Sequence, residues 1–343
     1  MRLLAILTIC VALSGCGDTG GGGGPAGSSG SSGSSGAGSS ASERIDLMLD
    51  FFPNADHAGI YAAEAGGHFR DQGLDVNIRT PSDPSVPLKL LAAGKADLAV
   101  SYEPEVLRAR DKGLPVVAVA ALVRVPLTSI VSLPKAGIRT PADLRGKTVG
   151  TAGIDYQSAY LDAVLDKAGV PRSSVRERNV GFELSAALLS GKVDAVLGAF
   201  WNYEGVQLAQ KGKDPQVIRM EQAGVPTYDE LVLAASEETV RDHPERIKRF
   251  LAALAKGTAD LKTHPGRAGG ALLAANRDLD PKLQGAAIRV TLPYFLPEAG
   301  KPYGYMDPGE WRSFTTFMHS NGLLKLATPE GAFTNELLPA AGG

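Results

Sequence analysis

The chain has 343 residues, of which 44% are hydrophobic and 21% charged, with a formal net charge of −2. These proportions are ordinary for a globular protein, and the near-neutral charge gives no reason to expect nucleic acid or an anionic membrane surface as a partner. The two cysteines, Cys10 and Cys16, both lie near the amino terminus, so the rest of the chain offers no disulfide, thiol nucleophile or thiolate metal site.

Residues 1–16 are predicted to be a lipoprotein signal peptide. A short basic start precedes an apolar run over residues 3–13 that is too short to span a bilayer. Residues 13–16 read Leu-Ser-Gly-Cys, which is typical of a bacterial lipobox with Cys16 as the lipidated residue. The alternative is an ordinary signal peptide with an incidental cysteine. Residues 17–42 are almost entirely Gly, Ser and Ala. We expect them to form a disordered tether with a reach of roughly 25–30 Å.

From residue 43 onward the pattern alternates strands and helices, which predicts an α/β fold with largely parallel sheets. Strands are expected at residues 44–49, 75–79, 96–101 and 116–122, and helices at 58–72, 87–93 and 103–112. A glycine follows each of these helices, at Gly73, Gly94 and Gly113. Glycine at this position favours the left-handed cap that ends many helices.

A second unit of the same kind begins near Gly137. Thr140, a following proline and Asp143 predict the start of a helix. Strands follow at 148–151, 175–180 and 193–199, with helices at 156–168 and 184–190. The chain then returns through a strand at 231–235 and a long amphipathic helix at 244–263.

This order predicts two lobes joined by two crossing segments, near residues 126–134 and 226–231. Lobe 1 would contain residues 43–130 and 231–343, and lobe 2 residues 131–230. A cleft between two such lobes is the natural ligand site, and closure of the hinge around the ligand is the expected motion.

The junction between the first strand and the first helix carries the strongest candidate site. It gathers the carboxylate of Asp50, the rings of Phe51 and Phe52, the amide of Asn54 and the imidazole of His57. Open α/β sheets bind ligands at such junctions, where strands end. Capping of the helix is the alternative role for the polar side chains, and the pattern leaves open which phenylalanine faces the cleft. His57 has no cysteine or second histidine close by, so we expect no metal.

Other candidate side chains follow later strand ends or open later helices. They are Tyr102, Glu105, Arg124, Asp155, Tyr156, Phe200, Asn202, Glu204 and Tyr228. A solvated helix face is the alternative for Glu105, and an ion pair is the alternative for Arg124. Tyr228 lies at the second crossing and is expected to act as a lid or hinge contact.

Several ordered motifs resemble one known family. Residues 50–57 are similar to the pattern Asp-Trp-x-Pro-Asn-x-x-His, and residues 67–76 to Gly-Tyr-Phe-x-x-x-Gly-Leu-Asp-Val. The Ser-Tyr-x-Pro-x-Val-Leu motif of residues 101–107 and the Gly-Ala-x-x-Asn-x-Glu motif of residues 198–204 continue the series. Together they resemble the thiamine-pyrimidine-precursor binding proteins of ABC importers, which are related to the fungal pyrimidine synthase.

The resemblance implies a type II periplasmic-binding-protein fold and a monomer that is lipid-anchored outside the cytoplasm. Such a protein would capture formylaminopyrimidine or hydroxymethylpyrimidine without a cofactor. It would deliver the ligand to an ABC permease, with ATP hydrolysed by separate subunits.

The resemblance also implies roles for individual side chains. Phe52 and Tyr102 would stack on the heterocycle, while Asp50 and Asn54 would pair with its edge. Glu204 would hold the polar tail of the pyrimidine from lobe 2. In the family a tyrosine stands where this chain has Phe200, so one hydrogen bond to that tail is lost. Trp201 and Tyr203 are the candidates to compensate for it.

Two other functions remain as alternatives. The related synthase carries a lysine for pyridoxal phosphate and an active-site histidine at the positions of Ser101 and Glu105. A Schiff base needs an amine, so we do not expect an enzyme. The second alternative is a binder of another small molecule, riboflavin or a sulfonate. The acidic and aromatic candidates suit a flat, basic heterocycle better than a sulfonate.

Overall fold

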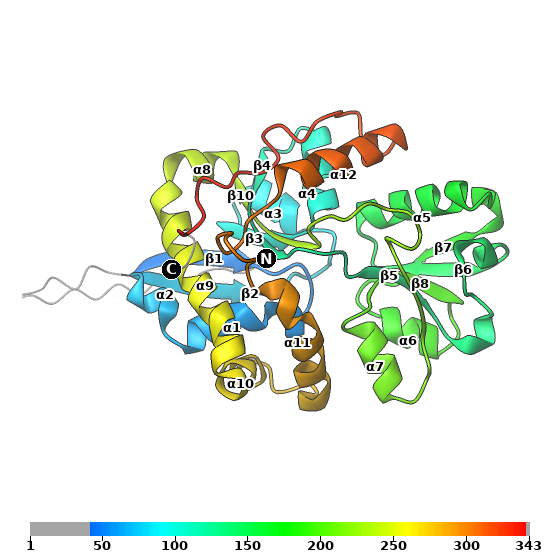
Figure 1. Cartoon of the computed structure of the whole chain (residues 1–343), viewed down its shortest axis with the longest axis horizontal. Coiled ribbons are helices and arrows are strands. Elements are labelled where there is room, and N and C mark those ends of the chain that lie inside the picture. Colours follow the sequence, from blue (N-terminus) through cyan, green and yellow to red (C-terminus); the bar gives the residue numbers. More distant parts are fainter. Residues whose placement is uncertain (1–41, 341–343) are drawn as a thin grey trace, which may run out of the picture. The chain divides into compact units, whose positions relative to one another are not determined.

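The computed structural model describes residues 42–340, which form a mixed α/β structure around two five-stranded sheets (Figure 1). We call the part built on the first sheet lobe 1 and the part built on the second sheet lobe 2. The predicted lipobox at Cys16 and almost all of the predicted tether lie outside the described residues. Across residues 42–340, no helix is both long enough and apolar enough to cross a bilayer.

The first sheet has the strand order β2-β1-β3-β10-β4. Its strands are β1 (Glu43–Met48), β2 (Leu74–Arg79), β3 (Leu98–Ser101), β4 (Val116–Val123) and β10 (Leu231–Ser236). β1 pairs in parallel with β2 and β3, with Leu47 beside both Ile78 and Leu98. β10 lies between β3 and β4 and runs antiparallel to both. The returning chain therefore fills the interior of a sheet that the earlier strands began.

The second sheet has the order β7-β6-β8-β5-β9. Its strands are β5 (Thr128–Ser132), β6 (Thr148–Thr151), β7 (Arg176–Asn179), β8 (Ala195–Phe200) and β9 (Gln216–Arg219). β6 pairs in parallel with β7 and β8, while β5 runs antiparallel to β8 and β9.

The first crossing segment ends earlier in the chain than the sequence predicted. β5 starts at Thr128, inside the segment assigned to lobe 1, because Thr128 pairs with Phe200 of lobe 2. The chain thus crosses over residues 124–127, after β4 ends, and the expected boundary at residue 130 cuts through a strand. The strands β5 and β9 were not predicted, because both lie in segments that read as connections between lobes.

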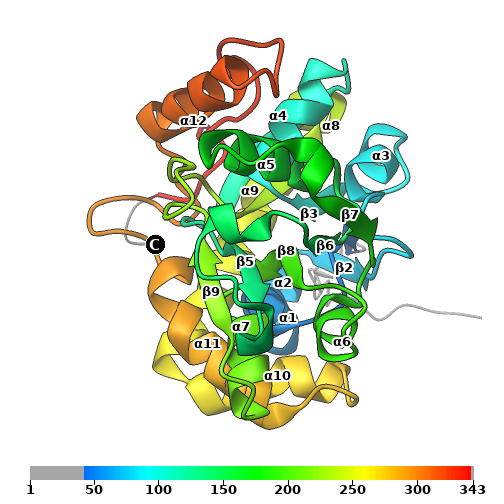
Figure 2. The same cartoon turned by 90° about the vertical axis from the view of Figure 1, so that its right-hand side faces the viewer.

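Helices cover both sheets. In lobe 1 they are α1 (Ala58–Ala65), α2 (His68–Asp71), α3 (Pro87–Ala92), α4 (Glu103–Asp111), α8 (Glu237–Asp242), α9 (Pro244–Thr263), α10 (Pro265–Ala275), α11 (Pro281–Phe295) and α12 (Pro308–Ser320). In lobe 2 they are α5 (Asp155–Lys167), α6 (Leu184–Leu189) and α7 (Glu204–Gln210). Figure 2 shows α5 above the second sheet and α6 and α7 below it. Short 3-10 turns, including η1 (Ala55–His57), complete the fold.

The helix predicted over residues 58–72 is in fact two helices, so that prediction was wrong. Gly67 has a φ of +76°, in the left-handed region that an α-helix cannot contain, and it separates α1 from α2. The capping motif predicted at Thr140 is confirmed, because the Thr140 and Asp143 side chains cap each other's backbone N–H groups.

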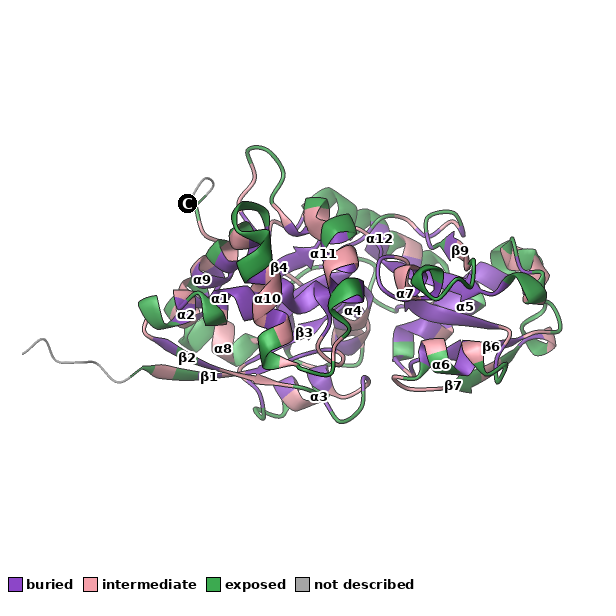
Figure 3. Cartoon of the chain, turned by 90° about the horizontal axis from the view of Figure 1, so that it is seen from below, coloured by how far each residue is buried: buried purple, intermediate pink, exposed green. Residues whose placement is uncertain are grey.

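α1 and α9 approach each other closely at small residues. A Cβ atom built on Gly257 of α9 would lie 2.4 Å from the backbone nitrogen of Ala63 in α1. The ring of Phe69 stacks on that of Phe250 nearby, with centroids 4.8 Å apart. Figure 3 shows buried residues, in purple, along the central strands and on parts of the helices, and these residues form the core of each lobe. Because α1 starts directly after η1, this packing also positions the junction that follows β1.

Candidate functional site

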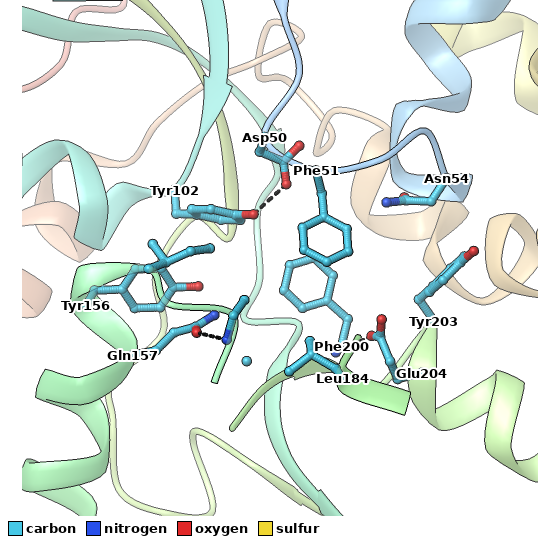
Figure 4. Close-up of a pocket in the computed structure, with 13 residues that line it drawn as sticks. Asp50, Phe51, Asn54, Tyr102, Tyr156, Gln157, Leu184, Phe200, Tyr203 and Glu204 are labelled. Carbon is cyan, nitrogen blue, oxygen red and sulfur yellow. Dashed lines mark hydrogen bonds between the residues drawn. The ribbon is translucent and has the colours of Figure 1, made fainter. Parts of the chain in front are cut away.

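A pocket lies where strands of both lobes end, as drawn in Figure 4. The space between its side chains, together with the solvent at its mouth, amounts to about 390 Å³. It is lined by Asp50, Phe51, Asn54, Tyr102, Ala152, Ile154, Tyr156, Gln157, Leu184, Gly198, Phe200, Tyr203 and Glu204. Six of the residues predicted from the sequence therefore meet here: Asp50, Asn54, Tyr102, Tyr156, Phe200 and Glu204.

Aromatic rings form most of the pocket wall. The ring of Tyr102, directly after β3, lies 5.5 Å from that of Tyr156 and 6.4 Å from that of Phe200, centroid to centroid. Phe51, and not Phe52, faces this pocket. Phe52 packs at 4.6 Å against Phe51 and lines a neighbouring pocket with Phe182. Phe51, rather than Phe52, is therefore the ring placed to stack on a ligand in this pocket.

The Asp50 carboxylate is held from two sides. The Tyr102 hydroxyl donates to Oδ2 at 2.5 Å, and Nε2 of His57 lies 2.7 Å from Oδ1. Nδ1 of His57 accepts the backbone N–H of Asn54 at 3.2 Å. In the neutral ring the proton must then sit on Nε2, which donates to Asp50. His57 does not line the pocket; it orients Asp50 as a hydrogen-bond acceptor.

Asn54 has the capping role that was the alternative in the sequence. Its Oδ1 accepts the N–H of Asp56 at 2.8 Å, and its Nδ2 donates to the carbonyl of Phe52 at 3.1 Å. The side chain lines the pocket but already has partners for both polar atoms. Its main effect is to shape the turn that carries Asp50 and Phe51.

Glu204 faces the pocket from lobe 2. It is the first residue of α7, and its Oε2 accepts the N–H of Phe200 at 2.8 Å. Burial raises the pKa of this carboxyl group to about 7. Asp50 and Glu204 thus place acceptor oxygens on opposite lobes, and among the described residues that line the pocket none is Lys, Arg or His.

Three predicted residues lie away from this pocket. Glu105 accepts a hydrogen bond from Ser101 at 2.5 Å and lines a different cavity. Asp155 of α5 pairs with Arg108 and Lys112 of α4, at 2.8 and 2.5 Å, and so connects the lobes at the surface. Arg124 forms the ion pair that was its alternative role, with its guanidinium group 2.6 Å from the carboxylate of Glu298.

Tyr228 belongs to the hinge and does not line the pocket. Its hydroxyl donates to the buried carboxylate of Glu230 at 3.0 Å. Glu230 also accepts from the backbone N–H groups of Leu127 and Thr128, both at 2.6 Å, and from the Thr128 hydroxyl. One carboxylate therefore connects the two crossing segments.

Asn202 also lies outside the pocket, between the lobes. Its Nδ2 donates to Oδ1 of Asp56 and to Oγ1 of Thr291, both at 2.7 Å. Asn202 belongs to lobe 2, whereas Asp56 lies in η1 and Thr291 in α11 of lobe 1. The side chain is fully buried, and it fixes the loop that carries Phe200, Tyr203 and Glu204.

Replacing Asn202 with alanine should weaken ligand binding by about 1 kcal/mol, or roughly fivefold, through loss of the two hydrogen bonds between lobes. Most of the change is expected in the dissociation rate, because the lobes then separate more easily. Stopped-flow fluorescence measures both rates. Asn321→Ala is the matched control, because Asn321 directly follows α12 and its Nδ2 donates to the carbonyl of Phe317 within the same lobe. Equal dissociation rates in the two variants would contradict the role of Asn202.

Several buried acids predict how stability depends on pH. Burial raises the pKa to about 7 for Asp56, Glu105, Glu204, Asp229 and Glu230. Between about pH 4 and pH 7 the folded protein therefore holds protons that the unfolded chain has released, so stability falls as the pH rises through this window. One such group alone loses about 1.4 kcal/mol per pH unit up to its folded pKa, so we expect a net loss of at least about 3 kcal/mol, or roughly 5 °C or more in the thermal midpoint, between pH 5 and pH 8.

Differential scanning fluorimetry of the domain across this range measures the effect. Glu105→Gln should flatten the profile, because its amide oxygen can still accept from Ser101 while the group no longer titrates. A midpoint that rises between pH 5 and pH 8 would contradict the prediction.

Sequence reasoning considered residues 153–157 only as a helix start whose backbone amides suit an anionic or carbonyl group. It gave no binding role to the side chains of Gln157, Ala152, Ile154 and Leu184 or to Gly198, all of which line the pocket. Tyr203 was considered only as a substitute for the phenol missing at Phe200. The apolar members read as core positions, and no pattern in one sequence distinguishes a pocket wall from a core. Gly198 has a φ of +101°. A glycine permits this backbone conformation, but its presence in a sequence does not predict it.

Two sheets with two crossings and a pocket between them define the periplasmic-binding-protein fold. The alkanesulfonate-binding protein SsuA of Xanthomonas axonopodis pv. citri, solved with bound MOPS, has the same fold. Its TM-score is 0.66 at 17% identity, covering 85% of this chain and 98% of that chain. The predicted fold class is confirmed.

Sequence comparison identifies the family. The NMT1/THI5-like family matches residues 54–268. A Haemophilus influenzae protein named for thiamine biosynthesis is 40% identical over 290 residues, 84% of this chain and 90% of its own length. The formylaminopyrimidine-binding protein of Halalkalibacterium halodurans is 36% identical over 300 residues, with coverages of 86% and 91%. The chain belongs to the NMT1/THI5-like family, which confirms the resemblance found in the motifs.

Proposed function

We propose that this protein is the solute-binding component of an ABC importer and that it captures a thiamine pyrimidine precursor, formylaminopyrimidine or hydroxymethylpyrimidine. The observation that carries the proposal is the pair of acceptors, Asp50 and Glu204, on opposite lobes of an aromatic pocket. A ligand that bridges them holds the lobes together, which is how binding favours the closed form.

The chemistry of the wall suits an aminopyrimidine. Phe51 and Tyr102 can stack on a flat ring, with a gain of about 0.5–1.5 kcal/mol beyond burial. The Asp50 carboxylate can accept from the exocyclic amine, because His57 and Tyr102 hold it as an acceptor. Glu204 can accept from a polar substituent at the other end of the ring. Tyr203 also lines the pocket, but its hydroxyl points away from Phe200 (Figure 4) and accepts from Gln284 at 3.0 Å, so it does not replace the phenol missing at Phe200.

A sulfonate fits the pocket less well. An anionic group requires cationic or N–H donors, whereas the charged residues lining this pocket are the acids Asp50 and Glu204. The likeness to an alkanesulfonate-binding protein therefore extends to the fold and not to the chemistry of the site.

The synthase alternative is disfavoured by the same pocket. No lysine is among the described residues that line it, and Ser101 stands where the synthase carries its lysine. Ser101 is buried and donates to Glu105. Because serine has no amine, pyridoxal phosphate cannot form a Schiff base at this position.

The location and assembly complete the proposal. The lipobox at Cys16 would anchor the protein to a membrane outside the cytoplasm, through the Gly/Ser tether. The folded domain would act as a monomer, and its ligand-bound form would dock on a permease served by separate ATPase subunits. Metabolic labelling of the full chain with a palmitate analogue tests the anchor, and Cys16→Ser should abolish that labelling.

A thermal-shift screen of the domain from Glu43 onward tests the ligand. The compounds are formylaminopyrimidine, hydroxymethylpyrimidine, thiamine, riboflavin and taurine. A ligand at 100 times its Kd stabilises the domain by about 2.7 kcal/mol, which raises the midpoint by roughly 5–10 °C. A shift with the aminopyrimidines alone supports the proposal. A shift with riboflavin or taurine alone would overturn the ligand assignment and leave the importer role.

A further inference from the structure

Among the described residues of lobe 2, Gln157 is the one that lines the pocket with a neutral side-chain amide. It is the third residue of α5, and only 2% of its surface is exposed. It lies between Ala152 and Gly198, and Figure 4 shows its side chain beside the aromatic wall. Such a buried amide needs partners for its oxygen and its nitrogen.

The orientation of the amide follows from its neighbour. The backbone N–H of Ala152 lies 2.7 Å from Oε1 of Gln157. A backbone N–H can only donate, so the bonded atom must be the amide oxygen and the NH2 group must point the other way. The amide nitrogen lies beside the Tyr156 hydroxyl (Figure 4), which can accept one of its two N–H groups, so the second N–H is the donor left for a ligand.

Gly198 makes room for this NH2 group. A Cβ atom on residue 198 would lie 2.2 Å from Nε2 and 2.6 Å from Cδ of Gln157. The φ of +101° also favours glycine at that position. The backbone of β8 and the N–H of Ala152 together hold the amide in one orientation, with its donors toward the pocket and the Tyr156 ring.

We infer that Gln157 is a specificity-determining residue, and that the ligand must present a hydrogen-bond acceptor to its NH2 group. The inference rests on the proposed binding function of this pocket. Asp50 and Glu204 offer acceptors, so the pocket selects a flat heterocycle with N–H donors at two edges and a ring nitrogen or carbonyl oxygen between them. Aromatic amines that carry donors alone are excluded, because they leave a buried N–H without a partner.

A variant that changes only the donor tests this inference. Gln157→Glu keeps the side-chain length and an oxygen for the Ala152 N–H. At about pH 8.5, above the pKa of about 7 that burial gives the neighbouring Glu204, the new carboxyl group is ionised and replaces NH2 with an oxygen that cannot donate. Gln207→Glu is the matched control, because Gln207 lines the neighbouring pocket and not this one. The thermal midpoint of each variant without ligand shows that it is folded.

The probes are hydroxymethylpyrimidine and its two pyridine analogues, in which CH replaces one ring nitrogen. Calorimetry should show that wild type and Gln207→Glu bind one analogue at least tenfold more weakly than the pyrimidine. Gln157→Glu should bind the pyrimidine more weakly and lose that discrimination. Equal discrimination by all three proteins would overturn the inference while leaving the proposed function intact.

A wrong ligand assignment would give a different set of binding results. If wild type binds riboflavin and no pyrimidine, the ligand assignment fails, and the same variants are titrated with riboflavin. The inference then predicts at least tenfold weaker riboflavin binding to Gln157→Glu than to Gln207→Glu. Equal riboflavin affinities would overturn it, and a wild-type domain that binds no heterocycle would overturn both proposals.

Discussion

Replacing Asp50 with alanine is expected to weaken aminopyrimidine binding by about 1–3 kcal/mol, or roughly 5- to 150-fold in Kd. The carboxylate lines the pocket and is held by the Tyr102 hydroxyl at 2.5 Å and by His57 at 2.7 Å. Its removal leaves the ligand amine without an acceptor, and the two protein donors lose theirs as well. Isothermal titration of the domain measures the change in Kd.

The control for Asp50 is an acid that makes a surface ion pair. Asp162 pairs with Arg172 at 2.5 Å, and its side chain is 54% exposed. Such pairs contribute about 0–1 kcal/mol, so Asp162→Ala should leave the ligand affinity unchanged. If Asp50→Ala behaves like Asp162→Ala, Asp50 has no part in recognition. A lower thermal midpoint of Asp50→Ala without ligand would report only the two unpaired donors.

Replacing Gly257 with alanine is expected to destabilise the fold by about 2–4 kcal/mol. The new Cβ would lie 2.4 Å from the nitrogen and 2.6 Å from Cα of Ala63. Both atoms belong to the backbone of α1, so no side-chain rotation can relieve the clash and α1 must move away from α9. Chemical denaturation of the domain measures the loss in the free energy of unfolding.

The same substitution in the neighbouring helix should have the opposite sign. Gly270 lies in α10, and no atom beyond its own helix lies within 4 Å of the Cβ that would be added. Gly270→Ala should stabilise the protein by about 0.5–1 kcal/mol through helix propensity. If both variants change stability by the same amount, the close approach of α1 and α9 does not limit the packing.

The predictable part of the site lies where polar residues follow strand ends. Asp50 and Tyr102 come directly after strands with clear apolar patterns, so both could be placed at one edge of a sheet. Glu204 and Phe200 came from the motif that the family shares. The unpredicted part depends on contacts across the lobes. Asp155 and Asn202 stand beside true pocket residues in the sequence, yet their side chains bind the other lobe.

In the fold, too, elements set by neighbouring residues were predicted, whereas elements set by distant partners were not. The periodicity of α9 predicted its length, because the pattern lies within one helix. The strand β5 was assigned to a crossing segment, because its partners β8 and β9 lie many residues further along the chain. Whether Phe51 or Phe52 faces the ligand depends on Phe182, which the sequence alone cannot place beside them.

The position of β10 between β3 and β4 has a consequence for the order of folding. The segment from Thr128 to Arg219 contains every strand of the second sheet, so lobe 2 can fold as one continuous stretch. The first sheet has a gap between β3 and β4 until residues 231–236 arrive. Pairings of such long sequence separation form slowly. Lobe 1 is therefore expected to fold late and to limit the rate of folding. Until β10 is in place, the unpaired edges of β3 and β4 are the part of the nascent chain most prone to aggregate.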